Sequence, residues 1–75
     1  AMHRESWGEA LAAFDRLLAE QPTSRLAPEA RFWRGHCLDR LGRRADARAA
    51  WMELVTTTPD SGWAKDAAAR LAAPR

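Results

Sequence analysis

A set of residues recurs in this chain at a fixed interval of 37 positions, as from Ala10 to Ala47. The five matching pairs are Ala10 and Ala47, Phe14 and Trp51, Pro22 and Pro59, Ser24 and Ser61, and Ala30 and Ala67. A fixed period between about 20 and 50 residues is typical of proteins built from stacked units. The sequence therefore predicts two periods of a helical repeat read from the middle, which is one complete helix pair flanked by two single helices.

Apolar residues at spacings of three and four predict four amphipathic helices. Pro22 stops the first helix, Pro28 starts the second, Gly42 caps its end, and Pro59 ends the third. The predicted ranges are residues 5–21, 28–41, 44–57 and 62–72. No strand pattern occurs, so we predict an all-α fold. The helices should form one antiparallel array, a single domain over residues 1–75.

Polar side chains near two helix starts can cap them. Ser6, with Glu9 three residues later, has the spacing of a capping box for the first helix. Either Asp60 or Ser61 is suitable as the cap of the fourth helix. The threonines at 56–58 are expected to weaken the last turn of the third helix.

The second and third helices each carry a small residue near the middle, Gly35 and Ala47. Glycine in a helix interior costs about 1 kcal/mol relative to alanine, so its presence here indicates close packing. We expect Gly35 to lie at the closest approach of the two helices, opposite Ala47 or Trp51. The predicted structural residues are Ala10, Phe14, Gly35, Leu38, Gly42, Ala47, Trp51 and Leu54.

The order of small residues, an aromatic residue and a closing proline over residues 30–59 resembles a tetratricopeptide (TPR) repeat. The resemblance implies a right-handed superhelical array. It also implies a non-enzymatic scaffold that binds a partner peptide or helix in a groove, or assembles with itself. The long period and the Pro-x-Ser step at Pro22 and Pro59 are similar to TPR proteins of the bacterial cell envelope. Examples are the periplasmic coordinator of the Tol–Pal system and the outer-membrane assembly lipoprotein. This likeness suggests the periplasm or cell envelope, and a cytoplasmic location stays open.

Carried over by position, the resemblance places part of the second helix on the groove. Arg31 and Arg34 depart from the family, which usually has large apolar residues there. Either Phe32 and Trp33 pack in their place, or the arginines lie over their neighbours with the charged groups in solvent. It therefore stays open whether Phe32 and Trp33 face the groove or the core. The groove candidates are Glu29, Phe32, Trp33, His36, Asp39 and Arg40.

Six arginines offer an alternative function, an anion-binding or nucleic-acid-binding helical domain: Arg31, Arg34, Arg40, Arg43, Arg44 and Arg48. Nucleic-acid binding is disfavoured, because Asp39 and Asp46 interrupt the basic stretch and the first helix is acidic. We expect these arginines to lie on a solvated helix face with ion pairs within the chain, such as a pair of Asp39 with Arg43 at a spacing of four.

No combination of residues predicts catalysis, a metal site or a cofactor. His36 and Cys37 are adjacent on a helix, so their side chains point about 100° apart and cannot act as a base and nucleophile. Cys37 is interpreted as a small buried hydrophobe. No apolar run reaches the roughly 18 residues that a membrane span needs, so no membrane insertion is expected.

Both ends of the predicted array lack a neighbouring helix, and a repeat unit buries its apolar face only against neighbours. The start Ala1-Met2 resembles a cloning remnant, so we expect a fragment of a longer protein. The exposed apolar side chains would then be covered by self-association or by the rest of the parent chain. The self-association candidates are Trp7, Leu11, Leu18, Trp63, Ala67 and Leu71.

Overall fold

The computed structural model describes residues 4–73, so the Ala1-Met2 start lies outside the described residues. Four helices are present: α1 (Arg4–Glu20), α2 (Ala27–Arg40), α3 (Arg44–Thr57) and α4 (Gly62–Ala72). Over residues 4–73 there is no strand, which confirms the all-α class. Each helix boundary lies within one residue of its predicted position, which is the usual scatter of helix ends.

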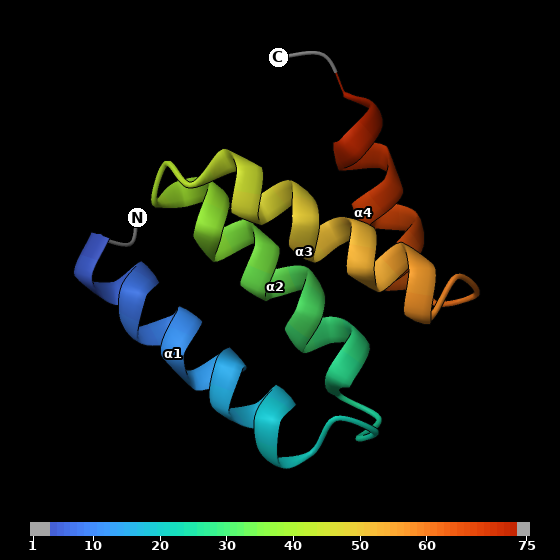
Figure 1. Ribbon diagram of the computed structural model, residues 1–75, viewed down its shortest axis with the longest axis horizontal. Helices are drawn as coiled ribbons and strands as arrows, with labels where there is room; N and C mark the ends of the chain where they lie inside the picture. The colour runs from blue at the N-terminus through green and yellow to red at the C-terminus, as the bar shows by residue number, and fades with distance from the viewer. Residues whose placement is uncertain (1–3, 74–75) are drawn as a thin grey trace.

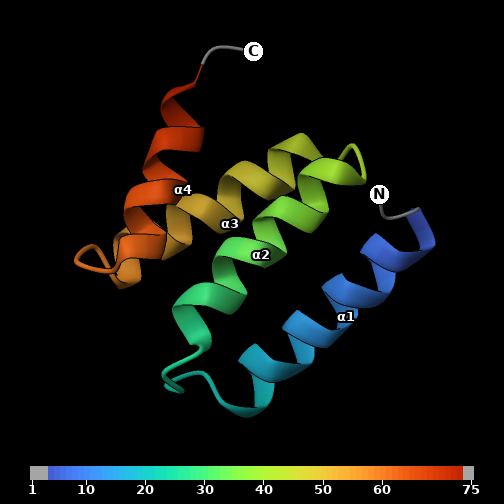
Figure 2. The same ribbon diagram turned by 180° about the vertical axis from the view of Figure 1, so that it is seen from behind.

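The helix α2 lies at the centre of the fold. It runs antiparallel to α1 on one side and to α3 on the other, as Figure 1 shows. The last helix packs against α3 and also reaches α2, crossing the array at a steep angle. Figure 2 shows the same order from behind. Since α2 has three neighbours, its apolar residues are distributed around the helix rather than along one stripe.

The turn between α2 and α3 is built on Gly42, whose φ of +83° is the left-handed conformation that glycine adopts most easily. The N–H of Arg43 donates to the Leu38 carbonyl at 2.8 Å, and the N–H of Gly42 donates to the Asp39 carbonyl at 3.0 Å. These two bonds form a Schellman motif, which confirms the predicted cap.

The cap of α4 is Ser61, whose Oγ accepts a hydrogen bond from the N–H of Trp63 at 3.1 Å. The predicted capping box at Ser6 is wrong, because α1 already begins at Arg4 and Ser6 lies inside the helix. The hydroxyls of Thr56, Thr57 and Thr58 donate to carbonyls four residues earlier, at 2.8, 2.8 and 3.1 Å. Such bonds compete with the helical pattern, and α3 ends at Thr57.

The core lies between α2, α3 and α4. The apolar residues predicted for it on α2 and α3, Leu38, Ala47, Trp51 and Leu54, are at most 5% exposed. The Trp51 indole packs on Gly35, which confirms the expected close approach of α2 and α3. Two other predicted structural residues, Ala10 and Phe14, are only half-buried because α2 is the one described helix that packs on α1.

The corners after α1 and after α3 share hydrogen bonds at Ser24 and Ser61. Ser24 Oγ accepts from the N–H of Leu26 at 3.1 Å, as Ser61 Oγ does from Trp63. The N–H of Ser24 donates to Gln21 and that of Ser61 to Thr58, both at 3.1 Å. These hydrogen bonds of the first corner recur 37 residues later, so at these positions the interval relates equivalent hydrogen bonds as well as equivalent residues. The helix entries differ, because α2 begins three residues after Ser24 and α4 begins directly after Ser61.

Candidate functional site

The predicted groove residue Phe32 belongs to the core. It is 4% exposed, and its ring centroid lies 5.2 Å from that of Trp33 and 5.3 Å from that of Trp63. The prediction that Phe32 lines a groove is therefore wrong. The physical reason is that α4 packs on α2 as well as on α3, and its residues Trp63 and Arg70 cover the Phe32 ring.

The two arginines that depart from the TPR pattern bridge α2 to its neighbours. Arg34 pairs with Asp15 of α1, and Arg31 Nε lies 3.7 Å from Glu53 Oε1 of α3. Phe32 meanwhile packs in the core. Both of the alternatives weighed for this helix therefore apply together, because one aromatic residue fills the interior and the arginines lie over the adjacent helices.

Four half-buried rings form a row that runs across α2. Trp7 of α1 contacts His36 at a centroid distance of 5.2 Å, His36 contacts Trp33 at 5.4 Å, and Trp33 contacts Trp63 of α4 at 6.0 Å. The first two contacts are edge-to-face, a favourable arrangement of rings. We call Trp7, His36, Trp33 and Trp63 the aromatic row.

Two arginines flank the aromatic row. The Arg40 guanidinium carbon lies 5.7 Å from the centroid of the Trp7 ring, and that of Arg70 lies 5.1 Å from the Phe32 ring and 5.7 Å from the Trp51 ring. Cations over aromatic faces are attracted by the ring quadrupole. The groove candidates Trp33, His36 and Arg40 are thus brought together on one surface.

The surroundings of His36 favour its neutral form. Burial lowers the pKa of its imidazole, the charges of Arg70 and Arg40 lower it further, and Asp39 opposes them. Arg70 Nη1 lies 3.3 Å from His36 Nδ1. An arginine can only donate, so this contact is a hydrogen bond in the tautomer that leaves Nδ1 unprotonated.

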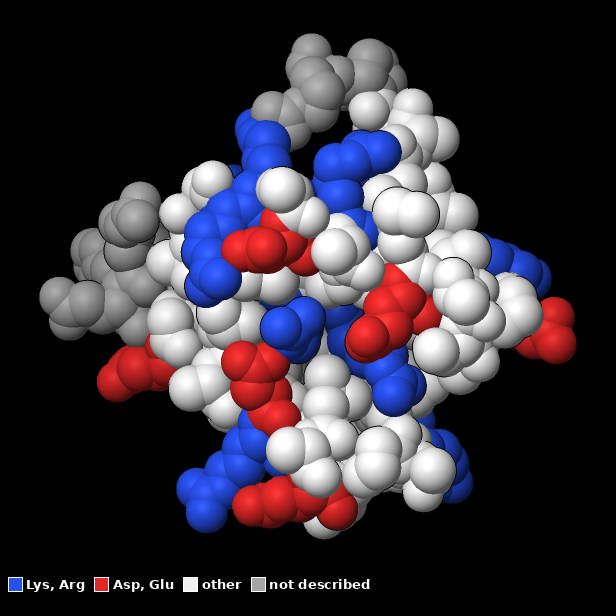
Figure 3. Space-filling model, in the orientation of Figure 1, with Lys and Arg blue, Asp and Glu red and all other residues white. Residues whose placement is uncertain are grey.

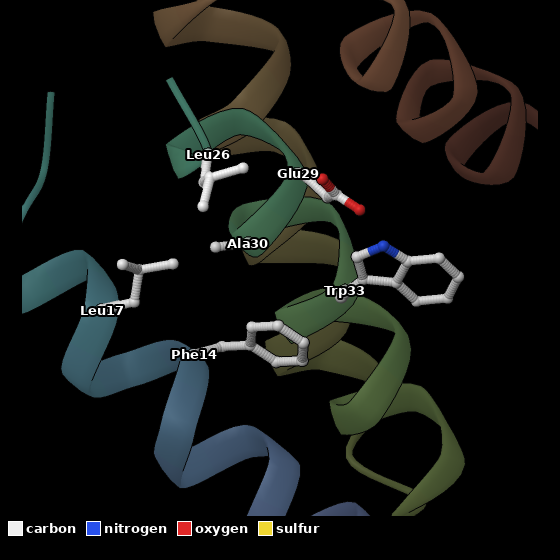
Figure 4. Close-up of a pocket in the computed structure, with 6 residues that line it drawn as sticks. All are labelled: Phe14, Leu17, Leu26, Glu29, Ala30 and Trp33. Carbon is white, nitrogen blue, oxygen red and sulfur yellow. The ribbon is translucent and has the colours of Figure 1, made fainter. Parts of the chain in front are cut away.

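An apolar pocket of about 290 Å³ opens between α1 and the start of α2. We call it the α1–α2 pocket, and its lining residues are Phe14, Leu17, Leu26, Glu29, Ala30 and Trp33. In Figure 4, Phe14 and Leu17 project from α1 toward Ala30 and Leu26, while Glu29 and Trp33 extend from farther round α2. Of the groove candidates, Glu29 and Trp33 therefore lie at this pocket.

The self-association candidates are better covered than the sequence suggested. Ala67 is 0% exposed and lies in the core, so its assignment to an exposed end is wrong. Leu11, Trp63 and Leu71 are half-buried and pack against the core. Leu11 does so from α1, which packs on α2, and the other two from α4, which packs on α3 and α2. The remaining candidates, Trp7 and Leu18, are also half-buried.

Two exposed apolar residues were missed by the sequence analysis. Leu26 and Met52 are each 56% exposed and are the large hydrophobic side chains most open to solvent in the described chain. Met52 lies outside the apolar stripe of α3, so a helical projection of the sequence would have identified it as exposed. Leu26 lies in the turn before α2, where no periodicity applies, and only its position beside Pro28 signals a helix entrance.

The arginines of the alternative hypothesis are mostly paired. Arg43 Nη2 lies 2.8 Å from Asp46 Oδ2, and Arg44 Nη1 lies 4.0 Å from Asp39 Oδ1. The expected pair of Asp39 with Arg43 is thus replaced by two others, because the Gly42 turn changes the helical spacing. Arg48 Nη1 is 3.4 Å from the Leu71 carbonyl oxygen. On the face of the molecule drawn in Figure 3, basic and acidic groups are interspersed.

Cys37 is 2% exposed, and burial raises the pKa of its thiol, as expected of a small core residue. Within residues 4–73, no three or more histidine, cysteine, aspartate or glutamate side chains gather as they would around a metal ion. No helix in the same range is long and apolar enough to cross a membrane.

Comparisons of this chain with protein-family models, with curated proteins and with solved structures found no match.

Proposed function

We propose that this chain is a non-enzymatic protein–protein interaction module that binds a partner segment along α2. The observation that supports the proposal is the aromatic row, with Arg40 and Arg70 at its edges. Tryptophan and arginine are the residues that most often dominate binding energy at protein interfaces. Because the four rings remain half-buried, a partner would bury their outer faces without rearranging the helices.

The recurrence of the corner hydrogen bonds after 37 residues supports a TPR-like array as the scaffold. Arrays of this kind extend by adding equivalent helices at either end. Partners of this module would therefore include a protein or peptide, a second copy, or the rest of a longer parent chain. Function in the bacterial cell envelope is part of the same proposal, and it depends on the TPR resemblance alone.

Anion binding is the less favoured function. Of the six arginines between positions 31 and 48, four are in ion pairs, Arg40 lies over Trp7, and Arg48 reaches a carbonyl group. Phosphate contacts give a steep loss of affinity with salt. Titration of a labelled mixed-sequence oligonucleotide at two salt concentrations would therefore reveal such a function, and we expect no saturable binding at physiological salt.

Site-specific crosslinking tests the interaction module directly. A photoreactive benzoylphenylalanine replaces Arg40, beside the aromatic row, and in a matched variant replaces Ala45, which is exposed on α3. After irradiation in the native cells, we expect protein adducts from position 40 and none from position 45. The protein found in an adduct is then purified and mixed with this chain to show that the two bind. Light scattering of this chain alone over a range of concentrations shows whether the partner is a second copy. Equal labelling from both positions would overturn the proposed function.

A further inference from the structure

We propose that the α1–α2 pocket receives an aromatic side chain from a partner helix, as the equivalent site on α3 and α4 receives Phe32. This inference rests on the proposed function and names the chemistry of the partner. It follows from the interval of 37 residues, which relates the two halves of the chain in sequence and in hydrogen bonding.

The six residues of the α1–α2 pocket each have a counterpart in the second half of the chain. Phe14, Leu17, Leu26, Glu29, Ala30 and Trp33 correspond to Trp51, Leu54, Trp63, Asp66, Ala67 and Arg70. Four of the six positions keep an apolar or aromatic residue and one keeps a carboxylate. The last position exchanges the flat indole of Trp33 for the flat guanidinium of Arg70.

In the second half, Phe32 fills the corresponding space. Its ring centroid lies 5.3 Å from that of Trp63, and the Arg70 guanidinium carbon lies 5.1 Å from the same ring. Leu54 and Ala67 belong to the same core cluster and are 0% exposed. In the second half of the chain, an aromatic side chain from a neighbouring helix, Phe32 of α2, therefore covers the site on α3 and α4.

In the first half, the helix equivalent to α2 is not among the described residues, and the space is open. A cavity of about 150 Å³ already accommodates a benzene ring. The α1–α2 pocket, at about 290 Å³, is therefore large enough for a phenyl or an indole group. Leu26, at 56% exposure, forms its outer wall. Helix-in-groove recognition uses such pockets for single apolar anchors.

The backbone of α2 adds a second requirement for the partner. Gly35, three residues after Phe32, leaves room for the Trp51 indole. Phe14 takes the place of Trp51 in the first half. The partner helix therefore needs a small residue three positions after its aromatic anchor, to make room for Phe14. Because a phenyl ring is smaller than an indole, alanine fits at this position as well as glycine.

Charge adds a third requirement. Glu29 is the one carboxylate that lines the α1–α2 pocket, and no ion pair within residues 4–73 involves it. A lysine or arginine next to the aromatic anchor would complement it. The segment Trp7–Ala10 of a second copy has the correct spacing but carries the exposed carboxylate of Glu9 two residues after Trp7, so a second copy is not the expected occupant.

A peptide of residues 24–43 meets all three requirements, because it contains Arg31, Phe32 and Gly35. It is labelled with fluorescein and titrated with the full chain by fluorescence anisotropy, and the matched control peptide carries Phe32→Ala. We expect saturable binding of the first peptide, and binding of the control at least about tenfold weaker.

Variants of the full chain locate the binding site. Leu26→Ser should weaken peptide binding by about tenfold, and Glu29→Arg should weaken it as well. The matched controls are Met52→Ser, with the same 56% exposure, and Asp60→Arg, an exposed carboxylate away from the pocket. Both controls should bind the peptide as the parent chain does, and circular dichroism should show that all variants are folded.

Three outcomes would overturn the inference. Equal binding by all variants would mean that the peptide replaces α2 in its own site. Absence of peptide binding, with crosslinks from position 40 retained, would leave the proposed function standing and exclude this partner chemistry. Self-association that Leu26→Ser abolishes without any peptide would identify a second copy as the occupant.

Discussion

The indole ring of Trp51 lies directly on Gly35, so that a β-carbon at Gly35 would be 2.6 Å from its Cδ1 and 2.8 Å from its Cε2. From this position the indole N–H donates a hydrogen bond to the Phe32 carbonyl oxygen at 3.2 Å. The Trp51 side chain thus joins α3 to α2 by packing and by a buried hydrogen bond. Both contacts are possible because Gly35 has no side chain.

Replacing Gly35 by alanine should destabilise the protein, although alanine is the better helix former. The added methyl group would overlap the indole, and overpacking of this kind costs about 1–3 kcal/mol. Gly35→Leu should cost more. Gly8→Ala is the matched control, because no atom lies within 4 Å of a β-carbon there. It should stabilise α1 by about 0.5–1 kcal/mol. Urea unfolding of the three variants checks this, and a stable Gly35→Leu variant would contradict the packing.

The same contact predicts a coupling between two substitutions. Trp51→Phe removes the hydrogen bond to Phe32 and leaves space above Gly35, so alone it should destabilise the fold. Combined with Gly35→Ala, the loss should be smaller than the sum of the single losses, because the smaller ring makes room for the methyl group. A double-mutant cycle in the free energy of unfolding measures this coupling. Additive losses would show that the two residues do not share one site.

Gly42→Ala should destabilise the turn between α2 and α3 by about 1–2 kcal/mol, because an L-residue is strained in the left-handed conformation. The φ angle at this position is +83°. Steric overlap is not the cause of the expected loss of stability, since a β-carbon at Gly42 would meet nothing within 4 Å. Gly42→Asn should therefore restore part of the loss, because asparagine tolerates the left-handed conformation better. Thermal melts of both variants distinguish strain from packing.

Replacing Arg43 and Arg44 together by serine should change the free energy of unfolding by less than about 0.5 kcal/mol. Both arginine side chains are more than half exposed, and so is Asp46, while Asp39 is 30% exposed. Ion pairs at the protein surface contribute little to stability. Chemical denaturation at low and high salt measures the effect. A large loss would mean that the turn is covered by an interface in solution.

Stability should fall as the pH falls from about 7.5 to 5.5, in part because of His36. Burial, Arg70 and Arg40 lower its pKa in the folded state below the ordinary value of 6.5, which the unfolded chain keeps. The unfolded state therefore takes up the proton first, and the loss is complete once the pH is below the folded-state pKa. His36→Gln should show a smaller decrease between the two pH values in urea midpoints. An identical decrease would contradict the role of His36.

Much of this fold was predictable because it is set by local interactions. Helix positions follow the apolar spacing, and the two caps at Gly42 and Ser61 follow from backbone geometry and a nearby hydroxyl. The contact of Gly35 with Trp51 was also accessible, since a glycine inside a helix needs a packing reason. For the candidate site, the sequence correctly brought Trp33, His36 and Arg40 onto one surface.

Other assignments depended on how the helices cross. The packing of α4 on α3 and α2 places Phe32 and Ala67 in the core, and no periodicity along one helix encodes that packing. The ion pairs of Arg31 and Arg34, and the pocket between α1 and α2, likewise join residues far apart in the chain. The sequence alone therefore determined the helices, the Gly42 cap and the glycine at the closest approach of α2 and α3. The tertiary structure decided which aromatic rings remain accessible, because burial depends on neighbouring helices rather than on a residue's own position in its helix.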